Sequence, residues 1–131
     1  MNASEERSLG IFERRILRRI FGAVKDGEVW GKRYNEEIEE LIGNETIVRH
    51  IKAERIRWLG HVQRTSEERM PRKIMKGVLY GNRRRGRPRK RWIDDVEKDL
   101  VQMGIQKWRR IVQERDTWKT VVKEAKANKK L

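Results

Sequence analysis

Residues 44–64 read NETIVRHIKAERIRWLGHVQR, and their apolar side chains recur three and four positions apart. This spacing places the apolar side chains on one face of an α-helix. We therefore predict a helix that begins at Asn44, ends near Arg64 and packs through its apolar stripe. The predicted stripe consists of Ile47, Ile51, Trp58 and Val62, with Ile56 and Leu59 beside it.

An amphipathic N-terminal helix is predicted from the same apolar period. Asn2 or Ser4 can cap its start, and Gly22 can end it in a left-handed conformation. The acidic residues that follow the cap suit the positive end of the helix dipole. A turn at residues 25–27 and an extended stretch around residue 29 come next, without the alternation typical of a strand.

Shorter helices are predicted along the rest of the chain. An acidic helix begins with Asn35 as its cap, and a brief helix has Pro71 in its first turn. Two more helices cover residues 92–103, ended by a glycine, and residues 108–125. Tryptophans at helical spacing more often form core than ligand contacts. We expect four of the five in the core: Trp58, Trp92, Trp108 and Trp118.

The predicted fold class is all-α, with about five short helices in two halves joined by a basic, largely disordered linker. Residues 82–91 include seven basic side chains, no acidic ones and no apolar group except the ring of Pro88, so they cannot pack. The predicted organisation is a helical segment over 1–81, the linker over 82–91 and a second helical segment over 92–131. Apolar residues make up only 36% of the chain, so the core should be small.

Charge is unevenly distributed along the chain. The 131 residues include 34 Lys and Arg against 20 Asp and Glu, a formal net charge of +14. Residues 1–65 carry 13 basic and 11 acidic side chains, a net charge of +2, whereas residues 66–131 carry 21 and 9, a net charge of +12. Such an excess attracts polyanions, either nucleic acid or an anionic membrane surface, and the Gly-Arg-Pro motif described below favours nucleic acid. The C-terminal half is therefore the predicted partner-binding half.

No catalytic or metal-binding set is visible. Without Cys, the chain has no disulfide, thiolate nucleophile or Cys-based zinc site, and His50 and His61 form no H-E-x-x-H motif. The sequence Trp-Ile-Asp-Asp at residues 92–95 superficially resembles the aromatic-x-Asp-Asp box that binds catalytic metals in reverse transcriptases. Here, however, Asp94 and Asp95 begin a predicted helix, where their charges suit the helix dipole. We expect no enzyme activity, cofactor or metal. No apolar run of roughly 18 residues exists, and we expect no membrane partner.

The sharpest local motif is the basic run RRRGRPRKR at residues 83–91. It resembles the AT-hook, whose Gly-Arg-Pro core enters the narrow minor groove of A·T-rich DNA. Gly86 permits close approach of the backbone, Pro88 favours an extended path, and Arg87 can reach into the groove. The same composition suits a nonspecific phosphate-binding segment, a nuclear localisation signal or a solvated linker. These alternatives stay open, and the expected location is the nucleus.

Basic side chains beyond this run extend the predicted surface. Arg109 and Arg110, with Lys119 and Lys123, lie on the side of the last predicted helix that faces away from its tryptophans. The candidate nucleic-acid-binding residues are Arg83, Arg84, Arg85, Gly86, Arg87, Pro88, Arg89, Lys90, Arg91, Arg109 and Arg110, with Arg87 and Arg89 expected closest to the bases.

Four stretches occur in an order that resembles a known family. They are ERRILRRIFG at residues 13–22, IRWLGHVQR at 56–64, GRPRKRW at 86–92 and the closing run over 108–125. Together they look like the C-terminal tail of the endonuclease and reverse transcriptase protein of non-LTR, LINE-type retrotransposons. The resemblance implies a segment that helps to hold template RNA or target DNA during target-primed reverse transcription.

The resemblance concerns the tail alone. The family's polymerase and endonuclease residues have no counterparts here, and the Cys-His zinc knuckle of some related elements is missing, so nucleic-acid contact must fall to basic residues. The expected partners are DNA, RNA or both, since both offer phosphates. The alternative function is a docking module for the reverse transcriptase domain of the parent element, with incidental nucleic-acid binding.

Overall fold

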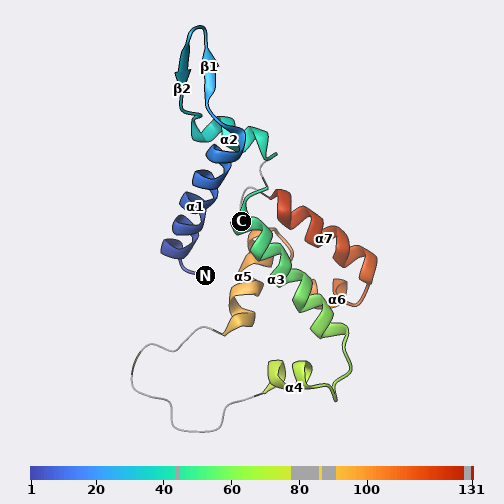
Figure 1. Ribbon diagram of the computed structural model, residues 1–131. Helices are drawn as coiled ribbons and strands as arrows, with labels where there is room; N and C mark the ends of the chain where they lie inside the picture. Colours follow the sequence, from blue (N-terminus) through green and yellow to red (C-terminus); the bar gives the residue numbers. More distant parts are fainter. Residues whose placement is uncertain (44, 78–85, 87–90, 129–130) are drawn as a thin grey trace.

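The computed structural model describes residues 1–43, 45–77, 86, 91–128 and 131 (Figure 1). These residues form an all-α fold with a small β-hairpin, which confirms the predicted fold class. The described part contains seven helices instead of about five. The elements are α1 (Ala3–Phe21), β1 (Val24–Asp26), β2 (Val29–Gly31), α2 (Asn35–Leu41), α3 (Ile47–Arg64), α4 (Met70–Lys76), α5 (Trp92–Gln102), α6 (Trp108–Ile111) and α7 (Arg115–Ala127).

The ends of α1 follow the local signals in its sequence. The Asn2 side chain accepts a hydrogen bond from the backbone N–H of Glu5 at 2.8 Å, and the Glu5 carboxylate accepts one from the Asn2 N–H at 2.8 Å. This reciprocal pair satisfies two backbone donors at the start of the helix. At the other end, Gly22 adopts a φ of 70°. Asn2 as the cap and Gly22 as the end are therefore both confirmed.

A β-hairpin follows α1, although no strand was predicted there. Strands β1 and β2 pair antiparallel, with Lys25 opposite Trp30. Gly27 has a φ of 62°, a left-handed conformation that permits the tight connection. Three residues per strand are too few for a period-two pattern to stand out, so the sequence predicted only a turn and an extended stretch. The hairpin is exposed and stands at one end of the molecule (Figure 1).

Other helix ends agree in part with the prediction. Helix α2 is capped by Tyr34, so Asn35 is its first residue and not its cap. Helix α3 ends at Arg64 as predicted, but it begins at Ile47 behind a Thr46 cap, and the predicted start at residue 44 lies outside the described residues. Pro71 occupies the first turn of α4, as expected.

The core forms where α3 packs between α5 and α7. The segments on both sides of residues 82–91 therefore contribute to one hydrophobic cluster. Apolar area removed from water is the dominant source of stability in such a small domain. The buried members of this cluster from α3 are Ala53, Ile56 and Leu59; those from the C-terminal segment are Val96, Leu100, Trp108, Val112, Trp118, Val121, Val122 and Ala125. Val62 of α3 is also buried.

The closest contact in the core joins Trp118 of α7 to Gly60 of α3. Trp118 is 2% exposed, and its indole N–H donates a hydrogen bond to the backbone carbonyl of Ile56 at 3.1 Å. A Cβ built on Gly60 would lie 2.1 Å from the indole nitrogen. Only a residue without a side chain permits this approach, so Gly60 is a packing requirement and not a turn signal.

Two of the four tryptophans predicted for the core are exposed at the surface instead. Trp108 and Trp118 are buried, at 4% and 2% exposure, whereas Trp58 and Trp92 are 51% and 38% exposed. Helix α3 buries the face that carries Ala53 and Gly60, because small residues let α7 approach closely. Of the predicted stripe and its flanks, Ile56, Leu59 and Val62 are buried, Ile47 and Ile51 are partly buried, and only Trp58 was wrongly predicted to lie in the core.

The last predicted helix is also interrupted. Residues 108–125 form α6 and α7 with a break at residues 112–114. Ten positions along an unbroken helix rotate a side chain by roughly 280°, so Trp108 and Trp118 would point in different directions. The break allows both rings to reach the same core. No glycine or proline marks it, which is why the sequence predicted one helix.

Candidate nucleic-acid interface

Most of the predicted interface lies outside the described residues. Within the described part of the chain are Gly86, Arg91, Arg109 and Arg110. The residues outside it are Arg83, Arg84, Arg85, Arg87, Pro88, Arg89 and Lys90.

Arg91 marks the point where the basic run enters the folded body. Its side chain is exposed, and its backbone N–H donates a hydrogen bond to the Asp94 carboxylate at 2.9 Å, at the start of α5. Asp94 and Asp95 lie in the first turn of this helix, as predicted. Trp92 follows immediately. The end of the basic run is thus attached to a helix that is part of the core.

Arg109 and Arg110 are both exposed on α6, and not on the helix that carries Lys119 and Lys123. Arg109 forms an ion pair with Glu97 of α5 at 2.7 Å and lies 4.8 Å from the ring centre of Trp108. Exposed pairs of this kind contribute little stability and exchange partners readily. Arg109 therefore remains able to contact a phosphate.

Several other arginines donate hydrogen bonds to backbone carbonyls within the fold. The Arg64 guanidinium donates to the Val112 carbonyl at 2.8 Å, and that of Arg72 donates to the Gln63 carbonyl at 2.7 Å. Arg18 of α1 donates to the Arg33 carbonyl at 3.2 Å. These side chains stabilise backbone carbonyls. They should contribute less to ligand binding than their charge alone suggests.

An aromatic depression that the sequence did not predict lies between α3 and α5. We call it the tryptophan pocket; it is open to solvent, has a volume of about 340 Å³ and is lined by His50, Ile51, Glu54, Arg55, Trp58 and Trp92. The rings of Trp58 and His61 are stacked, with centroids 5.2 Å apart and an interplanar angle of 28°. One feature of the sequence could have indicated this surface, because Trp92 directly follows the basic run.

The one acidic side chain of the tryptophan pocket has basic partners. The Glu54 carboxylate lies 3.2 Å from the Arg57 guanidinium and 3.8 Å from the Lys126 ammonium. Its charge is therefore compensated. With Arg55 and two imidazoles nearby, the surroundings of the exposed rings are neutral to basic. An anion can approach this surface without meeting an unpaired carboxylate.

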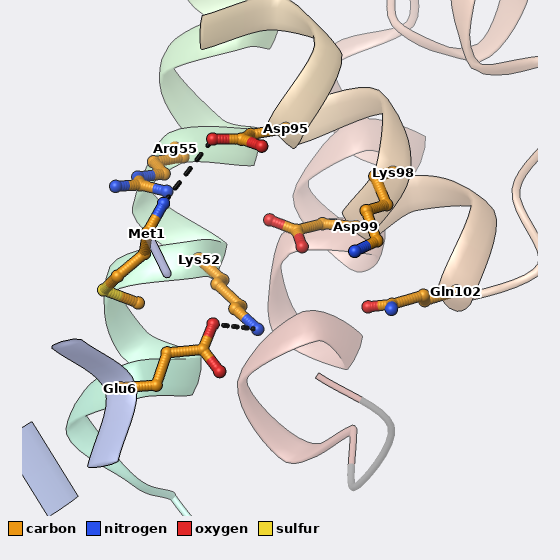
Figure 2. Close-up of a pocket in the computed structure, with 8 residues that line it drawn as sticks. All are labelled: Met1, Glu6, Lys52, Arg55, Asp95, Lys98, Asp99 and Gln102. Carbon is orange, nitrogen blue, oxygen red and sulfur yellow. Dashed lines mark hydrogen bonds and ion pairs between the residues drawn. The ribbon is translucent and has the colours of Figure 1, made fainter. Parts of the chain in front are cut away.

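A second pocket is polar and joins α1, α3 and α5 (Figure 2). Lys52 and Asp99 line it, and each is 7% exposed. The Lys52 ammonium lies 3.0 Å from the Glu6 carboxylate and donates a hydrogen bond to the Leu131 carbonyl at 2.7 Å. Opposite charges thus compensate one another between helices. This arrangement holds α1 against the core, and we assign it to the fold rather than to ligand binding.

The Asp99 carboxyl makes the stability of this pocket depend on pH. Burial raises the pKa of Asp99 above its usual value, although Lys52 and Arg55 act in the opposite direction. A carboxyl whose folded-state pKa is raised stabilises the fold in acid, and that contribution is lost as pH rises through the folded-state pKa. We expect Asp99→Asn to raise the midpoint of urea denaturation at pH 7 and to leave it unchanged in acid, below both pKa values.

The control for this substitution is Asp26→Asn in the exposed hairpin, which reports the general effect of removing one negative charge. Denaturation curves of all three proteins at both pH values make the comparison. An Asp99→Asn protein that is less stable than the wild type at pH 7 would show that the ionised carboxylate stabilises the fold through Lys52.

Comparison with known proteins adds no homologue: no family model, curated protein or solved structure matches this chain. Across the described residues, no group of three His, Cys, Asp or Glu side chains could hold a metal ion. No helix in the same part of the chain is long and apolar enough to cross a membrane.

Proposed function

We propose that this chain is a basic nucleic-acid-binding module, similar to the C-terminal tail of non-LTR retrotransposon proteins, that contacts template RNA or target DNA. The observation that carries the proposal is the net charge of +12 on residues 66–131, concentrated in a run over 83–91 that has no acidic side chain. The module has no enzyme activity of its own, and its basic run is suited to direct it to the nucleus.

The folded body supports this role because it includes α4, which precedes the segment that contains the basic run, and α5, which follows it. Helix α3 contacts both of these helices. Anchoring the helices on both sides of a segment reduces the conformational entropy that its ordering on a ligand must overcome. Arg91, at the end of the basic run, and Arg109 and Arg110 of α6 are exposed. Phosphate contacts from these groups release counterions and provide most of the affinity.

The direct test is fluorescence anisotropy of A·T-rich duplex, G·C-rich duplex and single-stranded RNA, each titrated with the full chain at two salt concentrations. We expect binding to all three that weakens steeply with salt, because counterion release dominates. An A·T preference would assign the run to the minor groove. Equal binding would assign it to nonspecific phosphate contact. No binding near physiological salt would refute the proposal.

Docking on a polymerase domain is the second candidate, and helix α1 favours it. None of the residues of α1 is buried, and it exposes Ile11, Phe12, Ile16 and Ile20. Exposed apolar side chains on one helix are typical of a protein contact surface. Concentration-dependent association in sedimentation, together with weak nucleic-acid binding, would favour docking over the first proposal.

A further inference from the structure

The tryptophan pocket exposes two large aromatic side chains that the core does not bury. Burial of a tryptophan is among the largest single contributions to a small core, yet α3 and α5 leave two of them at 51% and 38% exposure. Both line one depression, and one is stacked on an exposed imidazole. Fold stability alone gives no reason for placing two indoles here.

We propose that the tryptophan pocket binds one unpaired nucleobase, stacked against Trp58 and Trp92. The inference rests on the proposed nucleic-acid function and adds to it a preference for unpaired over fully paired strands.

The chemistry of the pocket fits a nucleobase. Trp58 and Trp92 offer flat π-faces, on which any base stacks with little dependence on sequence. Ile51 adds an apolar wall, and the imidazole of His50 and the guanidinium of Arg55 supply polar groups at the edge. A planar ring with polar edges matches this combination of apolar face and polar rim.

Continuity with the basic run favours a nucleotide over an apolar protein side chain. Trp92 directly follows Arg91, whose exposed cationic side chain lies one residue from the pocket and can contact a phosphate beside a bound base. Among the described residues that line the pocket, Glu54 is the one with a carboxylate, and that group has two basic partners and does not repel phosphate. A base inside a duplex is stacked on both sides and cannot offer its face, so only an unpaired base can enter.

The test compares a short oligouridylate with a duplex of the same length. Binding of the oligouridylate should quench tryptophan fluorescence, and Trp58→Ala and Trp92→Ala should each weaken its binding roughly tenfold, within the range measured for base stacking. Duplex binding should stay within about twofold of wild type, because phosphate contacts are untouched. Trp92→Phe keeps an aromatic face and should restore most of the lost affinity.

The matched control is Trp30→Ala, since Trp30 is also exposed, at 67%, but lies in the hairpin and does not line the pocket. It should bind both ligands as the wild type does. Salt-dependent binding that no pocket variant weakens, with no quenching, would overturn the stacking inference and leave the proposed function standing. Absence of binding to either ligand would overturn both. Unchanged circular dichroism of each variant shows that the fold is retained.

Discussion

Gly60→Ala is expected to destabilise the protein by about 3 kcal/mol or more, the upper end of the range for overpacking in a core. The added Cβ would lie 2.1 Å from the indole nitrogen of Trp118. The indole ring cannot move away easily, because Trp118 is buried and its N–H donates a hydrogen bond to the Ile56 carbonyl. Helices α3 and α7 would have to separate. Urea denaturation followed by circular dichroism measures the loss.

Two controls separate this steric effect from the general effect of alanine in a helix. Gly10 of α1 has only the flexible end of Arg14 nearby, so Gly10→Ala should stabilise the protein by roughly 0.5–1 kcal/mol. Adding Trp118→Phe to Gly60→Ala makes room for the methyl group, so the double variant should be more stable than the sum of the two single effects predicts. A Gly60→Ala protein as stable as the wild type would contradict the packing described here.

Replacing Arg87 and Arg89 together with alanine is expected to cause the largest change in ligand binding. If each arginine contacts one phosphate of B-DNA, the slope of log affinity against log salt should fall by roughly two units. Affinity at low salt should fall by more than at high salt, since counterion release contributes most there. Anisotropy titrations of one duplex across a series of salt concentrations give the slope directly.

A second pair of basic residues provides the matched control for that experiment. Lys25 and Lys32 lie in and beside the hairpin, at the end of the molecule opposite α4, and their replacement removes the same net charge (Figure 1). This control should leave the slope nearly unchanged. An unchanged slope in the Arg87 and Arg89 variant would remove these two residues from the interface and shift the phosphate contacts to other basic side chains.

Local signals in the sequence were sufficient for much of the helical structure. Asn2, Gly22 and Pro71 mark helix ends where the structure has them, and Gly104, with a φ of 83°, follows α5 as predicted. Capping and left-handed termination act within one turn of a helix, so a few neighbouring residues determine them. The hairpin escaped prediction because three residues are too short a strand to show a period.

The charge of the candidate interface is likewise a property of the sequence. The order of residues alone places the excess of basic side chains in residues 66–131, and packing of the chain does not alter this distribution along the sequence. The availability of each arginine for a ligand, in contrast, depends on the folded structure. Arg64 and Arg72 donate to backbone carbonyls across helices, and only the folded structure distinguishes them from exposed Arg91 and Arg110.

The sequence by itself thus determined the all-α class, most helix ends and the location of the positive charge. Tertiary structure alone decided that Ala53 and Gly60 of α3 are buried while Trp58 and Trp92 are exposed, although the sequence had predicted Ile56, Leu59 and Val62 for the packed face. An amphipathic pattern states that a helix has an apolar face, but the identity of its neighbours selects among the apolar residues. Gly60 admits the ring of Trp118, so α7 packs on that side of α3, and Trp58 stays exposed on the same helix.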